Sequence, residues 1–279
     1  MALSIILSTR GRPGTLIRTI EATLKKIALP DTKMLIAVDD DDHGTISVMD
    51  KIADDRVVWS VKPREDSLGE KYNRVMTELP ADVYLVMVDY APHVTDGFDA
   101  KIVEAASVYK DGYCIVYNHF ANRSFPQINA VTHKMAEAMG GIYPGWFPYW
   151  FVDHWLDDIG RMTGRIVFAD VLIDCSKRPG TMDKCEPGFW GQIYNLLYVE
   201  RHRIATEIIS APDFDDTEDR KKALIRNFVL TDERAVMINA GLNDDQSTAE
   251  PNERYARLKL KVLERLSVLR PDVVRKEAA

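Results

Sequence analysis

Continuous apolar runs recur along the first ninety residues and predict the strands of a buried sheet. Runs of this length without polar interruption suit strands that are covered on both faces, as in a parallel sheet. They are Leu3–Ser8, Met34–Val38, Val57–Val61 and Val83–Val88. After the first run, Pro13 suits the first turn of a helix with one apolar face, formed by Leu16, Ile17, Ile20, Leu24 and Ile27. This alternation of strands and helices predicts an α/β fold.

The rest of the chain predicts more strands and then a helical C-terminal part. Strands are expected at Tyr113–Tyr117, Ile128–Val131 and Ile166–Ile173, and helices at Glu70–Leu79, Phe98–Tyr109 and Val152–Met162, with a short helix after Thr132. Helices alone are expected later, at Gln192–Ile209, Glu218–Val229, Asp232–Ala240 and Glu253–Leu269. An apolar stripe in the last helix indicates that it packs on the sheet: Tyr255, Leu258, Val262, Leu266 and Leu269. We therefore predict a catalytic domain at residues 1–186 and a helical extension at 187–279.

Composition narrows the class of protein. A hydrophobic fraction of 46% in 279 residues is enough to build a core. The formal net charge of −7 argues against a broad nucleic-acid footprint, although a local basic groove stays open. Three scattered cysteines indicate reduced thiols rather than a disulfide framework. Because no apolar run reaches 18 residues, we expect a cytoplasmic protein without a membrane span.

Polar residues follow three of the predicted strands at the point where each ends. They are the run Ser8–Arg12, the aspartates Asp39–Asp42 and the pair Asp89 and Tyr90. In an open parallel sheet, ligands bind outside the carboxyl ends of the strands. Arginines with carboxylates suit a nucleotide, because arginine pairs with phosphate and aspartate accepts from a base or a ribose hydroxyl. For Asp40–Asp42 a solvated loop is the alternative, and neither GxGxxG nor a P-loop is present.

The order of these motifs resembles the family 2 glycosyltransferases, which are nucleotide-diphospho-sugar transferases of the GT-A fold. The motifs are SIILSTRGRP, MLIAVDDDD, SLGEKYNRVM, VYLVMVDY and VDHWLDDIGRMTGR, and they cover about Leu3–Ile173. The resemblance implies a Rossmann-like, mostly parallel sheet flanked by helices. It also implies nucleotide-binding roles for Thr9, Arg10, Arg12, Asp39, Lys71 and Asn73, with Gly69 at the start of the same helix.

The resemblance further implies that Asp89 opens the metal-binding DxD element. This chain has Ala91 where the family has the second carboxylate. A divalent cation, Mn²⁺ or Mg²⁺, needs oxygen ligands in addition to the diphosphate. His93 or one of Asp40–Asp42 could assist Asp89, so metal dependence stays open. Basic residues after the late strand, Lys177, Arg178 and Lys184, are an alternative means of neutralising the diphosphate.

A second candidate site opens the helix predicted at Val152–Met162. By resemblance, Asp153 is the general base that takes the proton of the acceptor hydroxyl. Asp157 shares its helix face and is a second candidate. Capping of the helix N-terminus is the alternative role for these acids, and His154 is either a metal or phosphate contact or a packed histidine. The aromatic loop before the helix offers Trp146, Tyr149 and Trp150 for acceptor stacking, or it forms a buried lid.

These observations predict transfer of a sugar from a nucleotide diphosphate to a hydroxyl acceptor, with inversion implied by resemblance. The acceptor is a glycan, a small molecule or, as an outside case, a modified base in DNA. One alternative is a nucleotidyltransferase that forms sugar nucleotides. The other is a non-catalytic nucleotide- or glycan-binding protein of the same fold, which Ala91 favours.

Overall fold

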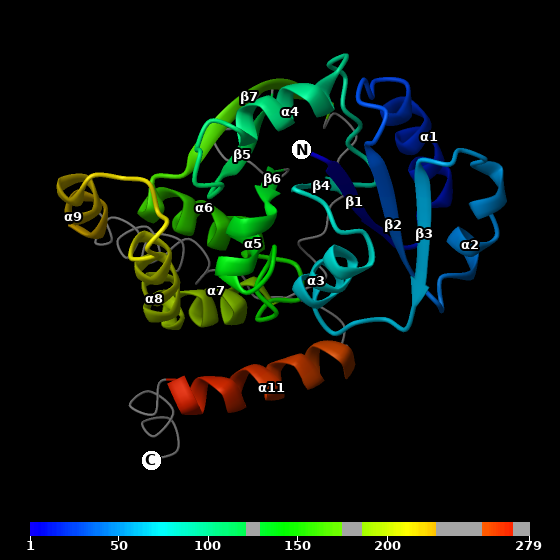
Figure 1. The fold of residues 1–279 in the computed structure, drawn as a ribbon. Coiled ribbons are helices and arrows are strands. Elements are labelled where there is room, and N and C mark those ends of the chain that lie inside the picture. Colours follow the sequence, from blue (N-terminus) through cyan, green and yellow to red (C-terminus); the bar gives the residue numbers. More distant parts are fainter. Residues whose placement is uncertain (121–128, 175–185, 227–252, 270–279) are drawn as a thin grey trace.

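A single seven-stranded sheet organises the computed structural model, which describes residues 1–120, 129–174, 186–226 and 253–269. The strand order is β3-β2-β1-β4-β6-β5-β7 (Figure 1). The strands are β1 (Leu3–Thr9), β2 (Lys33–Asp39), β3 (Val57–Lys62), β4 (Val83–Val88), β5 (Ile115–Phe120), β6 (Asn129–Thr132) and β7 (Ile166–Ile173). β1 to β4 run parallel, as do β5 and β7, whereas β6 is antiparallel to both of its neighbours.

The helices surround this sheet and continue into the C-terminal part. They are α1 (Pro13–Leu24), α2 (His43–Ile46), α3 (Leu68–Glu78), α4 (Phe98–Ala106), α5 (His133–Met139), α6 (Val152–Thr163), α7 (Pro187–Leu196), α8 (Tyr198–Ile209), α9 (Glu218–Arg226) and α11 (Glu253–Leu269), with a 3-10 turn η1 (Met49–Lys51). Among the described helices, none is long and apolar enough to cross a membrane.

Both faces of the central strands are buried, which explains their continuous apolar sequence. On β1, Ile6 belongs to one hydrophobic cluster while Ile5 and Leu7 belong to a second. The second cluster also contains residues of α1 and α4, such as Leu16 and Ile102. The first contains residues of α3, α5, α6, α7, α8 and α11. Because side chains alternate along a strand, each cluster takes every second residue.

The C-terminal helices share the first cluster with the sheet. Leu258, Val262 and Leu266 of α11 are buried there, whereas Leu269 at its end is exposed. Figure 1 shows α11 lying along the underside of the fold, below α3 and α7. These three buried residues are members of the apolar stripe that the sequence predicts for this helix. The boundary that we place at residue 186 stays a prediction.

Two expected helices differ from the structure. The segment predicted as one helix at Gln192–Ile209 forms α7 and α8, which meet at Leu197, and α7 already begins at Pro187. The first helix ends at Leu24, so Ile27 packs on the core from beyond it. The helix expected at Asp232–Ala240 lies outside the described residues, as do Lys177, Arg178 and Lys184.

Candidate functional site

A cavity of about 700 Å³ lies at the carboxyl ends of β1, β2 and β4. Strand ends and the loops that follow them supply Thr9, Arg10, Arg12, Asp39, Arg64, Glu65 and Asp89 to its wall. The start of α3 supplies Ser67, Leu68 and Lys71, and the segment from the aromatic loop (Tyr143–Phe151) to α6 supplies Tyr149, Trp150, Asp153 and His154. The polar strand ends therefore meet at one site, as the sequence predicts for a parallel sheet.

Asp39 is the centre of a basic cluster in the wall of this cavity. Its side chain is buried and faces basic groups from three segments. Arg10 Nη1 lies 3.0 Å from Oδ2 and Arg64 Nε lies 3.6 Å from the same oxygen, while Lys71 Nζ contacts Oδ1. Such pairing allows a carboxylate to stay charged away from water. Arg10 and Lys71 were expected here from the sequence, and Arg64 was missed because it follows a strand without a recognisable motif.

The other aspartates of the acidic run have separate structural roles. Asp41 pairs with both terminal nitrogens of Arg10, and this charge-assisted bonding lowers the pKa of Asp41 to about 2. Asp42 caps α2 by accepting from Thr45 and also accepts from the Gly11 backbone N–H at 2.8 Å. Asp40 is exposed. Asp39 is thus the one member of this run that lines the cavity.

Asp89 follows β4, the neighbour of β1, and its side chain contacts the turn that follows β1. Its Oδ2 accepts from Thr9 Oγ1 at 2.7 Å and lies 3.0 Å from Arg12 Nε. Its Oδ1 is buried and has no hydrogen-bond partner among the described residues. Burial raises the pKa of Asp89, opposed by the Thr9 and Arg12 contacts. This unpartnered oxygen could accept a hydrogen bond from a ligand, or it could itself bind a proton.

The protein groups near Asp89 suit a divalent cation poorly. Ala91 is buried in the core, and no described group of three or more His, Cys, Asp or Glu side chains could hold a metal. His93 does not line the cavity, because it is buried and stacks on Phe98 with ring centroids 4.1 Å apart. One oxygen of Asp89 already faces the positive Arg12. One carboxylate oxygen is the lower limit of what a protein usually offers Mg²⁺, which is bound through one or two carboxylates together with substrate phosphates.

The start of α6 brings Asp153 and His154 to the wall of the same cavity. Asp153 Oδ1 accepts from the backbone N–H of His154 at 2.9 Å and lies 3.0 Å from His154 Nδ1. Asp157, one turn later, does not line the cavity. It is buried, accepts from Tyr117 at 2.9 Å and pairs with Arg161 at 2.9 Å. The structure therefore favours Asp153 over Asp157 as a group that meets a ligand.

Residues of α3 hold the aromatic loop in place. A Cβ on Gly69 would lie 2.3 Å from the Pro144 carbonyl oxygen, so the loop backbone rests directly on the helix. Asn73 does not line the cavity. Its amide donates to Tyr143 O at 3.0 Å and accepts from Ile142 N at 2.9 Å. The role of Asn73 here is to fix the loop, and its expected contact with a nucleotide has no support in this geometry.

The loop itself divides into a cavity-facing and a packed part. Tyr149 and Trp150 line the cavity, but Trp146 does not. Trp146 is buried under Arg265 of α11, whose Cζ lies 3.6 Å from the centre of the Trp146 ring. The loop ends at Phe151, the one described non-glycine residue with a positive φ, at 70°. Such backbone strain in a bulky residue is uncommon and often lies near functional groups. Phe151 lies two residues before Asp153.

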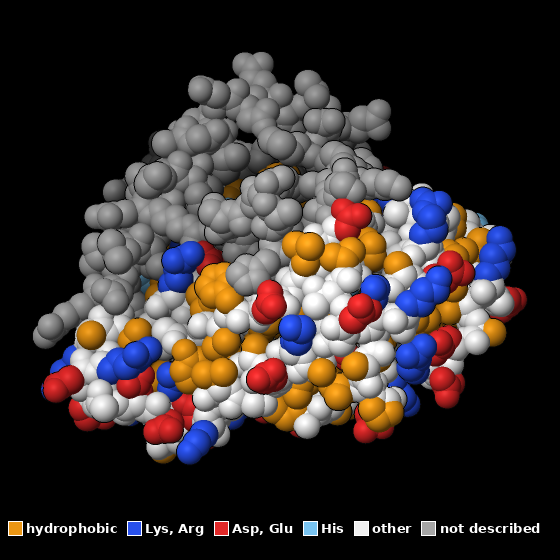
Figure 2. All heavy atoms as spheres, turned by 90° about the horizontal axis from the view of Figure 1, so that it is seen from above, with side chains coloured by type: hydrophobic (Ala, Val, Ile, Leu, Met, Phe, Trp, Pro, Cys, Tyr) orange, Lys and Arg blue, Asp and Glu red, His pale blue; other side chains and the backbone are white. Residues whose placement is uncertain are grey.

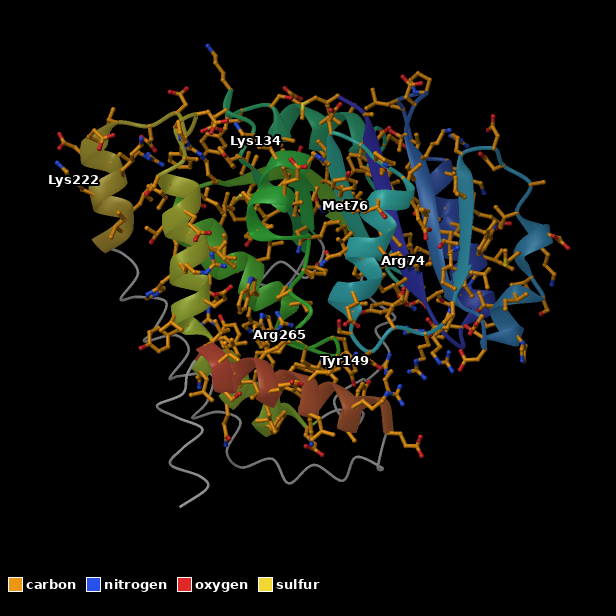
Figure 3. All side chains as sticks on the ribbon, turned by 60° about the horizontal axis from the view of Figure 1, so that its bottom comes forward. Arg74, Met76, Lys134, Tyr149, Lys222 and Arg265 are labelled. Carbon is orange, nitrogen blue, oxygen red and sulfur yellow. The ribbon has the colours of Figure 1, made fainter. Side chains whose placement is uncertain are left out.

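The C-terminal helix completes the cavity wall. Arg254 and Tyr255 line it, and Tyr149 packs on Tyr255 with ring centroids 6.2 Å apart. Figure 3 shows Tyr149 and Arg265 at the contact between the loop and α11. Arg254 was not foreseen, and Tyr255 was assigned to the apolar stripe. Tyr255, the aromatic residue at the start of the stripe, is the one sequence feature from which this part of the wall could have been predicted.

Comparison with known proteins identifies the fold. The chain is similar to the mannosyltransferase PcManGT from Pyrobaculum calidifontis, solved with GDP-Man and Mn²⁺, at a TM-score of 0.55 and 12% identity, over 96% of this chain and 81% of that one. It is similar to S. aureus TarS 1-349 in complex with UDP-GlcNAc at a TM-score of 0.58 and 13% identity, over 96% and 84%. The chain has the GT-A fold. No protein-family model and no curated protein sequence matches it.

Proposed function

We propose that this GT-A protein is a glycosyltransferase that moves a sugar from a nucleotide diphosphate to a hydroxyl acceptor. The observation that carries the proposal is that one cavity joins two sets of groups. Asp39 and its basic partners form the first set, which we assign to the nucleotide, and Asp153 lines the same cavity as Tyr149 and Trp150. The solved proteins similar in fold include a mannosyltransferase and a protein in complex with UDP-GlcNAc, which supports this reaction class.

In this proposal Asp153 is the general base. The acceptor hydroxyl oxygen attacks the anomeric carbon, the bond from that carbon to the diphosphate oxygen breaks, and the hydroxyl proton passes to Asp153. The nucleoside diphosphate leaves with the electron pair of the broken bond. Attack from the face opposite the leaving group inverts the anomeric centre. The carboxylate is held for this role by the His154 backbone N–H and by the contact with Nδ1.

Tyr149 and Trp150 supply the acceptor subsite. Aromatic faces pack well against the apolar face of a sugar ring. Trp150 Nε1 is buried without a hydrogen-bond partner among the described residues, so it can donate to an acceptor oxygen. On the face seen in Figure 2, described basic and acidic side chains intermingle with apolar ones, so this face offers no basic stripe to a DNA acceptor.

Transfer assays with a panel of nucleotide sugars, beginning with GDP-mannose and UDP-GlcNAc, test the proposal. Replacement of Asp153 by Asn should lower kcat by about 10²–10⁴-fold, because a positioned base contributes this much. Nucleotide affinity should stay near the wild-type value. Asp170→Asn is a matched control, since its side chain is 95% exposed on β7.

The outcomes separate the candidate functions. Turnover at the wild-type rate in Asp153→Asn would remove the base assignment alone. Release of pyrophosphate instead of nucleoside diphosphate would indicate a nucleotidyltransferase. Nucleotide binding without turnover of any donor would favour the non-catalytic binding protein, a candidate supported by the buried Ala91 in place of a carboxylate.

A further inference from the structure

The cavity wall is rich in basic side chains although the whole chain is acidic. Its net charge is −7, yet five basic residues line the cavity: Arg10, Arg12, Arg64, Lys71 and Arg254. Four acidic residues line it as well, and one of them, Glu65, is bound by Arg74. Arg10 is likewise paired outside the wall, with Asp41, so the basic groups of the wall exceed its carboxylates by one. A wall of this kind attracts an anion.

Two of these guanidinium groups retain hydrogen-bonding capacity. Arg12 Nε and Arg64 Nε are buried and make no hydrogen bond to any described residue, although each has an ion-pair contact with an aspartate. A buried N–H group that forms no hydrogen bond costs free energy, because it has lost its hydrogen bonds to water. Burial lowers the pKa of Arg64, and the nearby charges of Arg254 and Arg10 lower it further. A bound anion would relieve both the missing bonds and this repulsion.

Arg254 is held in position by the body of the protein. Its Nη1 donates to the Glu65 carbonyl oxygen at 3.0 Å, and its guanidinium lies 4.8 Å from the centre of the Tyr255 ring. The next turns of α11 are tied to the same loop, because Arg257 and Lys261 both pair with Asp66. A guanidinium fixed in this way loses little entropy when an anion binds.

We propose that the guanidinium groups of Arg12, Arg64 and Arg254 neutralise the donor diphosphate in place of a divalent cation. The inference rests on the proposed function, which supplies the diphosphate. It follows from the poor ligand set at Asp89, where Arg12 already faces one carboxylate oxygen. As the bond from the anomeric carbon to the diphosphate oxygen breaks, charge-assisted N–H bonds take up the negative charge that develops on that oxygen. The C-terminal helix is then part of the donor site.

Titration calorimetry of nucleosides and nucleoside diphosphates, in EDTA and in Mn²⁺, tests this inference. We expect the wild type to bind a diphosphate in EDTA, with affinity changed less than about threefold by Mn²⁺. Arg254→Ala should weaken the diphosphate by about tenfold or more, the loss expected for one charged hydrogen bond, and leave nucleoside affinity almost unchanged. Arg254→Lys should recover part of the loss, because it restores the charge without the planar fork.

Arg203→Ala is the matched control. Arg203 lies on α8, its side chain is 52% exposed, and it does not line the cavity. If Arg254→Ala and Arg203→Ala weaken the diphosphate equally, the role of α11 is refuted. Diphosphate binding that requires Mn²⁺ would overturn the cation-free inference and leave the glycosyltransferase proposal standing. Absence of diphosphate binding in either buffer would overturn both.

Discussion

Replacement of His93 by leucine should make the protein less sensitive to acid. The His93 side chain is 1% exposed and stacks on Phe98 with an angle of 19° between the rings. Neither ring nitrogen has a hydrogen-bond partner among the described residues. Burial without a partner disfavours the charged imidazolium and lowers the pKa of His93 to about 3. The ring is therefore neutral in the folded protein over the whole range in which a free histidine titrates.

The magnitude follows from the difference in proton binding between the two states. Since the folded pKa lies below the unfolded value of about 6.5, the unfolded chain takes up the proton first as pH falls. The contribution of His93 to stability is greatest above pH 6.5 and is lost as pH falls toward 3. Each pH unit costs about 1.4 kcal/mol, so the loss between pH 6.5 and pH 5 is about 2 kcal/mol. This figure requires only that the folded pKa lie well below 5.

Urea denaturation at pH 7.5 and pH 5.0 measures the effect. Between these pH values, the free energy of unfolding should fall by about 2 kcal/mol more in the wild type than in His93→Leu. Leucine also removes two buried nitrogens that lack hydrogen bonds, so the variant should be at least as stable at pH 7.5. His43→Gln is the control, because His43 is exposed on α2 and should follow the wild type. Equal losses in His93→Leu and the wild type would refute the reasoning.

Two further substitutions test contacts that hold the site. Gly69→Ala should lower the free energy of unfolding by about 1–3 kcal/mol, because the new Cβ would meet the Pro144 carbonyl. Gly14→Ala is the control and should not destabilise the protein, because the atom nearest to its new Cβ would be 3.9 Å away. Arg201→Ala should cost about 3–5 kcal/mol, seen as a lowered Tm, because it leaves Asp158 buried without the guanidinium 3.0 Å away. A loss below 1 kcal/mol in either variant would show that the neighbouring backbone or side chains adapt freely.

The parallel core was predictable because its physical cause is local. A strand covered on both faces must be apolar at every position, and β2 shows this from Met34 to Val38. The run ends where the strand meets the cavity, so Asp39 could be predicted to lie at the edge of the sheet where the cavity forms. The same reasoning located Asp89 after β4.

Roles that depend on depth and direction could not be predicted from spacing. Asp153 and Asp157 share a helix face, but one turn along the axis moves Asp157 from the cavity to the buried Tyr117. Trp146 and Trp150 belong to one loop, and only the packing of α11 decides which of the two is covered. Arg254 donates a hydrogen bond to the carbonyl of Glu65, from which it is separated by 189 positions in the sequence. No local pattern encodes a contact of that separation.

The segment SLGEKYN has structural roles that its sequence pattern does not reveal, beside the nucleotide contacts that stay a prediction. Ser67 and Glu70 cap α3 reciprocally, with bonds of 3.0 and 3.1 Å. Lys71 alone of the predicted pair reaches Asp39, whereas Asn73 holds the aromatic loop. The Leu68 backbone N–H also donates to the Pro148 carbonyl of that loop at 2.9 Å.

The start of α3 therefore joins Asp39 to the aromatic loop. Its lysine contacts Asp39, and its backbone and asparagine carry the loop that bears Tyr149 and Trp150. A displacement of α3 at Lys71 would move this loop, because Gly69 leaves no space between helix and loop. This continuity gives Gly69 and Asn73 a structural role beside Lys71, although neither of them lines the cavity.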